Sequence, residues 1–85
     1  MHKVYILLCC DNSFYIGFTI NLTKRLKNHN NKQGSFYLRS KLPVKLVYYE
    51  TCPTKEEAIK REKQIKGWSR IKKINLIKYG HQKIK

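Results

Sequence analysis

The segment Lys3 to Cys10 is apolar on both of its alternating faces, apart from Tyr5, and it constrains the fold of this chain most strongly. Side chains alternate between the two sides of a strand, so this pattern predicts a central strand of a sheet. Residues Asp11 to Ser13 follow, and such residues favour turns because their side chains hydrogen-bond locally. Phe14 to Thr19 is predicted to be a second strand that completes a hairpin.

The middle of the chain predicts two helices and a third strand between them. Asn21 is a suitable N-cap for a helix of about ten residues. Lys45 to Glu50 is the predicted third strand. Thr54 and Glu57 match a capping box, so a second helix begins there and stops near Gly67.

The end of the chain predicts a last helix capped by Ser69. Ile71, Ile74 and Ile77 are spaced three apart along it, and Gly80 marks its expected end. The order is therefore β-β-α-β-α-α, which indicates an α+β domain with helices packed on a small, largely antiparallel sheet. Without repeats or linkers, residues 1–85 are expected to form a single domain.

The junction between the second strand and the first helix gathers candidate site residues. Tyr15 and Gly17 point to the same side of the strand, and a glycine inside a strand often marks a close backbone or ligand approach. Arg25 and His29 are four apart and share a helix face. Each residue alone, Tyr5 included, has an ordinary structural explanation, but their convergence on one concavity predicts a site.

Glu62 is the most informative single residue. It falls in the apolar stripe of its helix with Ala58 and Ile65. A carboxylate that faces a core is costly unless it is paired or bound to a metal. Two explanations stay open: a buried salt bridge to Arg25 or Lys66, and a catalytic carboxylate. Because Mg²⁺ needs only one or two carboxylates plus phosphate and water, one glutamate in a basic groove is compatible with metal-assisted phosphodiester cleavage.

The charge of the chain indicates a polyanionic partner. Lys and Arg total 19 against five acidic residues, a formal charge of +14. Nucleic acid is the commonest such partner. A membrane surface is the competing partner, but the aromatic strands resemble core, and no apolar run approaches the ~20 residues of a membrane span.

The basic residues crowd the last two helices and the central loop. Taken singly, most of them are explained by a solvated surface, but together they favour contacts to a phosphate backbone that carry no sequence information. The residues expected to bind nucleic acid are Gly17, Tyr37, Arg39, Lys41, Lys66, Arg70 and Lys73.

The cysteines fit neither a disulfide framework nor a zinc site. Cys9 and Cys10 are adjacent on a predicted strand, Cys52 is distant, and no CxxC occurs. Reduced cysteines and the lack of a convincing signal peptide favour an intracellular, cytoplasmic protein.

Taken in order, these residues resemble the GIY-YIG nuclease domain, and in particular its small stand-alone URI-type or UPF0213 group. The resemblance covers about Lys3 to Ile77. The chain departs from the family pattern in two respects. Lys3 stands where the first motif of the family has a glycine. Many family nucleases also take target specificity from a second domain, so weak sequence preference is expected for this domain. The motif residues are Val4-Tyr5, Tyr15-Ile16-Gly17, Arg25, His29, and Glu62 within Glu57-Ala58-Ile59-Lys60-Arg61-Glu62.

The resemblance implies a three-stranded antiparallel sheet flanked by helices, and a single divalent metal, Mg²⁺ or Mn²⁺, held by Glu62. It implies that Tyr5 is the usual candidate for general base, with Tyr15 as a second hydroxyl. Arg25 would hold the scissile phosphate, and His29 would orient the site or assist proton transfer.

The leading hypothesis is a divalent-metal-dependent endonuclease that hydrolyses DNA phosphodiester bonds, with structure-selective cleavage in repair or recombination as a refinement. The alternative is a non-catalytic or weakly catalytic nucleic-acid-binding module on the same fold. RNA stays open as the ligand, because nothing in the sequence identifies the sugar.

Overall fold

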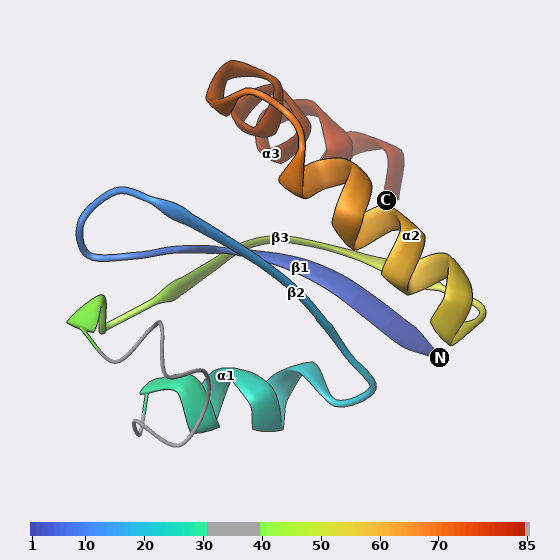
Figure 1. Ribbon diagram of the computed structural model, residues 1–85, viewed down its shortest axis with the longest axis horizontal. Coiled ribbons are helices and arrows are strands. Elements are labelled where there is room, and N and C mark those ends of the chain that lie inside the picture. Colours follow the sequence, from blue (N-terminus) through green and yellow to red (C-terminus); the bar gives the residue numbers. More distant parts are fainter. Residues whose placement is uncertain (31–39, 85) are drawn as a thin grey trace.

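The fold is a three-stranded sheet with three helices. The computed structural model describes residues 1–30 and 40–84, without the side chains of 81–84 (Figure 1). The predicted α+β fold is confirmed, because β1 pairs antiparallel with both other strands and the sheet order is β2-β1-β3. The elements in order are β1 (His2–Leu8), β2 (Phe14–Thr19), α1 (Leu22–Asn30), β3 (Lys45–Cys52), α2 (Lys55–Lys66) and α3 (Arg70–Ile84).

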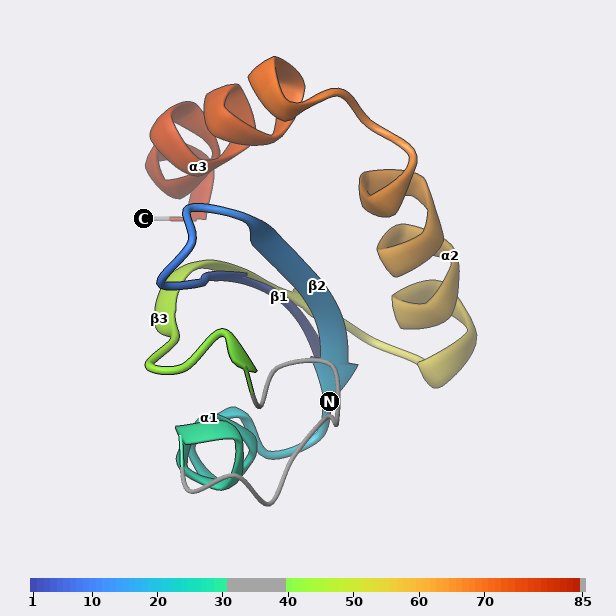
Figure 2. The same ribbon diagram turned by 60° about the vertical axis from the view of Figure 1, so that its left-hand side comes forward.

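The helices cover both faces of the sheet, as Figures 1 and 2 show: α1 lies on one face, and α2 and α3 lie on the other. The central strand β1 serves both layers because its side chains alternate. Val4 and Ile6 enter a buried cluster with α2 and α3. Tyr5 and Leu7 enter a second cluster with α1. The prediction of a central strand from its two apolar faces is thus confirmed.

The predicted caps begin all three helices. The side chain of Asn21 accepts a hydrogen bond from the backbone N–H of Lys24 at 3.0 Å, which satisfies one free donor of α1. Thr54 does the same for α2 at 3.2 Å, and Ser69 for α3 at 3.3 Å. These local bonds fix where each helix starts and therefore which side chains face the sheet.

The last helix extends beyond its predicted end. It continues through Gly80 to Ile84, where an end at Gly80 was expected. Gly80 serves packing instead, since a β-carbon there would lie 2.8 Å from the ring of Tyr48. Ile71 is 70% exposed, so it does not share the packed face to which Ile77 contributes. None of the helices in the described ranges is long and apolar enough to span a bilayer.

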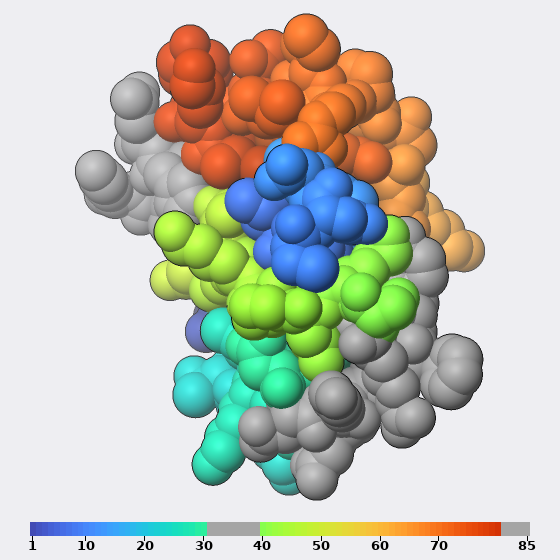
Figure 3. All heavy atoms as spheres, turned by 90° about the vertical axis from the view of Figure 1, so that its left-hand side faces the viewer, coloured from blue at the N-terminus to red at the C-terminus, as the bar shows by residue number. Residues whose placement is uncertain are grey.

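The β1–β2 turn lies at the end of the sheet shown in Figure 3, between α3 and the segment that leads into β3. Asn12 adopts a left-handed conformation with φ of 68°, and the side chain of Asp11 accepts a hydrogen bond from the Ser13 N–H at 3.0 Å. The predicted turn is thus confirmed. Cys10 N–H donates to the carbonyl of Lys41 at 3.1 Å, which ties the turn to this segment.

Candidate active site

A pocket of about 360 Å³ opens beside the edge strand β2. Because β2 is the outer strand, side chains of α1 on one face and of α2 on the other can meet around its edge. Four of the five candidate catalytic residues line this pocket. Its lining residues are His2, Tyr5, Tyr15, Gly17, Phe18, Thr19, Ile20, Arg25, Lys55 and Glu62.

Tyr5 lies at the bottom of the pocket and is 1% exposed. It is directly opposite Gly17 in the β1–β2 register, and its ring occupies the space that a side chain at Gly17 would fill. Burial raises the pKa of Tyr5 to about 12, the nearby Tyr15 adds to the rise, and the charge of Arg25 opposes it. The phenol is therefore protonated at neutral pH.

His29 lies behind Tyr5, on the last turn of α1. Its Nε2 is 3.2 Å from the hydroxyl oxygen of Tyr5, and the residue is 2% exposed. Burial lowers the pKa of His29, and the positive charge of Arg25 lowers it further. A neutral imidazole with its proton on Nδ1 accepts the phenolic proton of Tyr5 at Nε2.

His29 is not among the described residues that line the pocket. If His29 takes part in proton transfer, as predicted, it would therefore act through Tyr5. Tyr15 completes the cluster, with its ring centroid 6.4 Å from that of Tyr5 and 5.6 Å, edge-on, from that of His29. The three rings form one packed unit, which holds the Tyr5 hydroxyl in place.

Arg25 brings a permanent positive charge into the pocket from the middle of α1. The same charge acts on the pKa of both Tyr5 and His29. A guanidinium matches the geometry of a phosphate and binds it through two parallel hydrogen bonds. A phosphate held by Arg25 would therefore lie next to the Tyr5 hydroxyl.

Glu62 approaches the same pocket from α2, on the opposite face of the sheet. Its side chain is 16% exposed and forms a 3.4 Å ion pair with Lys66, whose side chain is 55% exposed. The salt-bridge explanation thus holds in part, but the pair is partly exposed rather than buried. Exposed pairs of this spacing contribute only about 0.3–0.5 kcal/mol, so the carboxylate remains available to a ligand.

The donor set of the pocket fits a hard divalent cation that is shared with a phosphate. In residues 1–30 and 40–80, no group of three His, Cys, Asp or Glu side chains could form a complete protein cage. Mg²⁺ does not need one, since it is commonly held by one or two carboxylates, water and phosphate oxygens. Glu62 is the carboxylate in the pocket lining, and its role as metal ligand stays a prediction.

The sequence prediction missed five residues of the pocket, of which three are polar: His2, Thr19 and Lys55. Lys55 is seven residues before Glu62 on α2 and therefore shares its face, a spacing that could have identified it. His2 carries a buried Nδ1 atom that has no hydrogen-bond partner within the described part of the chain. No sequence pattern pointed to His2, because it joins the pocket only through strand pairing.

The predicted nucleic-acid-binding residues divide into two sets. Gly17 lines the pocket. Lys41 forms a 2.6 Å ion pair with Asp11 beside the β1–β2 turn, and the pKa of Asp11 is lowered mainly by this contact. Arg70 stacks on the ring of Phe14 at 4.6 Å. These two cations lie outside the pocket, so they remain candidates for phosphates farther along a bound strand.

Two further predicted cations, Lys66 and Lys73, also lie outside the pocket lining. Lys66 pairs with Glu62, and Lys73 is half-buried on α3. Tyr37 and Arg39 lie outside the described residues, and their predicted roles stay predictions.

Comparison with known proteins points to one family. Residues 1–75 match the family model of the GIY-YIG catalytic domain. A UPF0213 protein of Staphylococcus saprophyticus is 48% identical over 93% of this chain and 96% of its own. A UPF0213 protein of Staphylococcus aureus is 47% identical over 91% of this chain and 94% of its own.

Two solution NMR structures resemble the fold. A UPF0213 protein of Bacillus halodurans has a TM-score of 0.59 at 42% identity, covering 91% of this chain and 82% of its own. A protein of Enterococcus faecalis has a TM-score of 0.66 at 37% identity, covering 95% of this chain and 86% of its own.

Proposed function

The chain belongs to the GIY-YIG catalytic domain family, a family of nucleases, and from this membership we propose that it is a divalent-metal-dependent endonuclease that hydrolyses DNA phosphodiester bonds. The observation that carries the proposal is the pocket at the edge of β2. There Tyr5 of β1, Arg25 of α1 and Glu62 of α2 line one open space. Each supplies a different requirement of phosphodiester hydrolysis.

Arg25 binds the scissile phosphate. Its two parallel N–H donors fix the phosphate next to the Tyr5 hydroxyl and stabilise the charge that builds on the oxygens during attack. Lys55, at the start of α2, provides a second positive charge in the same pocket. These cations give the pocket the sign that a nucleic-acid backbone requires.

Tyr5 and His29 form the proton-transfer pair. The phenol, with its pKa near 12, is a poor base alone, but the 3.2 Å hydrogen bond gives its proton a destination. Tyr5 takes a proton from the attacking water while its own proton passes to Nε2 of the neutral His29. The water oxygen then forms the new bond to phosphorus as the bond to the leaving oxygen breaks, and the leaving oxygen takes up a proton from solvent while His29 later releases its own.

Glu62 would hold Mg²⁺ or Mn²⁺, which when bound supplies positive charge to the phosphate in the transition state. Lys66 pairs with Glu62 at 3.4 Å, so its ammonium would compete with such a cation for the carboxylate. GIY-YIG nucleases generally use divalent metals, which agrees with a carboxylate at this place.

The charge of the chain supports nucleic acid as the substrate and leaves its form open. The formal charge of +14 favours any polyanion. Structure-selective cleavage during DNA repair or recombination is the refinement we favour. The cytoplasm is the compartment we favour, because free cysteines stay reduced there. A binding module with little catalysis, for DNA or RNA, is the alternative that the charge supports equally.

The proposal is tested by nicking of supercoiled plasmid DNA with Mg²⁺ and with excess chelator. We expect metal-dependent nicking by the wild-type protein and its loss in Arg25→Ala. The matched control is Lys24→Ala, which removes an exposed cation from the adjacent position of α1. Equal nicking by both variants, or nicking that is insensitive to the chelator, would overturn the assignment.

A further inference from the structure

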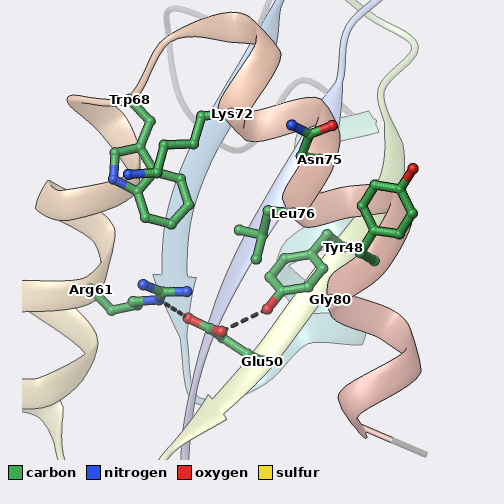
Figure 4. Close-up of a pocket in the computed structure, with 9 residues that line it drawn as sticks. Tyr48, Glu50, Arg61, Trp68, Lys72, Asn75, Leu76 and Gly80 are labelled. Carbon is green, nitrogen blue, oxygen red and sulfur yellow. Dashed lines mark hydrogen bonds and ion pairs between the residues drawn. The ribbon is translucent and has the colours of Figure 1, made fainter.

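A second pocket, of about 400 Å³, lies between β3, α2 and α3 (Figure 4). It is separate from the candidate active site, although the two share α2. Arg61 lines this pocket, and the next residue, Glu62, lines the other. The volume falls within the range of small-molecule sites, about 300–1,000 Å³.

The inner end of the pocket is a closed hydrogen-bond network that leaves no free negative charge. The buried Tyr48 donates its hydroxyl proton to Glu50 at 2.6 Å, and Arg61 Nε donates to the other oxygen of the same carboxylate (Figure 4). Burial, followed by the contact with Glu50, raises the pKa of Tyr48. Glu50 also raises the pKa of Arg61 against the opposing effect of burial. The carboxylate is thus neutralised by its partners and does not repel an anion.

The outer walls are aromatic and basic. Trp68 carries the guanidinium of Arg61 at 5.1 Å and the ammonium of Lys72 at 4.4 Å from its ring. Tyr79, also in the lining, is 57% exposed, so its ring is accessible to a ligand. No carboxylate in the described part of the chain forms an ion pair with Lys72.

These walls match a flat, apolar ligand that carries a negative charge. We propose that this pocket binds a nucleobase together with its phosphate. Tyr79, which is 57% exposed, provides aromatic surface for a face of the base, and Trp68 with its stacked cations Arg61 and Lys72 forms the wall beside it. Asn75, whose amide both donates and accepts, reads the edge of the base, and Lys72 pairs with the phosphate.

The inference takes from the proposed function only that the ligand is a nucleic acid. The nucleotide belongs either to a bound strand or to the free pool, since both present the same base and phosphate. In the first case the pocket holds a nucleotide away from the cleaved bond, on the far side of α2 from Glu62. It would then anchor the strand without taking part in the chemistry.

Trp68 is the only tryptophan in the sequence, so its intrinsic fluorescence reports this pocket directly. We would titrate the protein, with chelator present to prevent cleavage, with three probes: deoxyadenosine monophosphate, a short single-stranded oligodeoxynucleotide, and an abasic oligonucleotide of the same length. We expect saturable quenching by the oligonucleotide with bases, at an affinity about fivefold or more above that of the abasic strand. Quenching by the mononucleotide at comparable concentration identifies the free nucleotide as the ligand.

Variants separate the base from the backbone. Asn75→Leu should lower the affinity for the strand with bases and leave the affinity for the abasic strand unchanged. Lys63→Ala, an exposed cation of α2 outside the pocket lining, should leave the ratio of the two affinities unchanged. Both positions are exposed, so both variants should fold, which thermal unfolding verifies.

The outcomes keep the two proposals distinct. Equal affinities for the strands with and without bases, or a Trp68 signal that Asn75→Leu leaves unaltered, would overturn the base pocket even if the protein cleaves DNA. A base-dependent signal that Asn75→Leu abolishes supports the pocket even if no cleavage is found.

Discussion

A β-carbon built on Gly17 would lie 2.5 Å from the hydroxyl oxygen of Tyr5. The two residues are paired across β1 and β2, so the phenol extends over the glycine toward the pocket. The absence of a side chain at Gly17 is therefore what gives the Tyr5 hydroxyl its position. A glycine inside a strand often marks a close approach by another group. Here that group is the side chain of Tyr5 on the neighbouring strand.

Gly17→Ala should move the Tyr5 ring away from His29 and lower the cleavage rate about 100-fold, because displacements of ~1 Å in an active site have effects of this size. Overpacking should also lower the free energy of unfolding by about 1–3 kcal/mol. Gly67→Ala is the matched control, since its β-carbon would meet the nearest atom at an ordinary 3.6 Å. Urea unfolding and single-turnover cleavage measure the two effects, and wild-type rates in Gly17→Ala would contradict them.

Tyr5→Phe keeps the ring and removes the hydroxyl that contacts His29. We expect the single-turnover rate to fall by about 10²–10⁴-fold, the usual range for loss of a general base, with DNA affinity unchanged. If His29 acts through this hydroxyl, His29→Asn should add little to Tyr5→Phe, because residues that act as a unit are not additive. Multiplicative losses in the double variant would show that the two residues act separately.

The imidazole of His29 should titrate below its ordinary pKa of 6.5, because burial and the charge of Arg25 both disfavour its protonated form. The groups that face it are Tyr5, Tyr15 and Arg25. Arg25→Ala should therefore raise the His29 pKa, which NMR titration of the ring resonances measures. A value at or above 6.5 in the wild-type protein would contradict this account of the ring.

The same shifts set the pH dependence of stability. As pH falls below 6.5, the unfolded state takes up a proton at His29 before the folded state does, so the free energy of unfolding should decrease. As pH rises from 10 toward 12, the unfolded state loses the Tyr5 proton first, and stability should fall again. Urea unfolding across this range, in the wild-type protein and in Tyr5→Phe, should show the alkaline loss reduced in the variant.

Tyr48→Phe should lower the free energy of unfolding by about 1.5–3 kcal/mol, the usual effect of losing a hydrogen bond to a charged group. The bond that is lost is the one to Glu50, which also holds Arg61 of α2 against β3. Tyr49→Phe is the control, since Tyr49 lies next in sequence but is 38% exposed. Thermal unfolding that ranks Tyr49→Phe as the more damaging change would contradict this role of the network.

The element order could be predicted because local rules dominate it. Asn21, Thr54 and Ser69 cap their helices as expected, and the two apolar faces of β1 specify a central strand. Gly80 shows where such rules fail: a glycine ends a helix only in the absence of a packing reason to continue, and here the ring of Tyr48 provides that reason. That contact joins β3 to α3, which are far apart in the sequence, so no local pattern predicts it.

The main residues of the candidate site could be predicted, but their arrangement around the pocket could not. Alternation and helical spacing placed Tyr15, Arg25 and His29 toward one concavity, and the family resemblance added Glu62. Only the fold shows that His29 lies behind Tyr5 and outside the lining. The role of Glu50 in the second pocket could not be predicted from the sequence. Its partner Arg61 is eleven residues away on another element, so no local pattern links the two side chains.

The proposed mechanism requires the carboxylate of Glu62 for metal-dependent cleavage. The most direct test of this requirement is the single-turnover cleavage rate of Glu62→Gln in Mg²⁺, measured beside DNA affinity. The matched control is Glu57→Gln, an exposed glutamate on the first turns of the same helix. We predict a rate loss of about 100-fold or more in Glu62→Gln, with DNA affinity retained and Glu57→Gln close to wild type. Cleavage by Glu62→Gln at the rate of the wild-type protein would contradict the account.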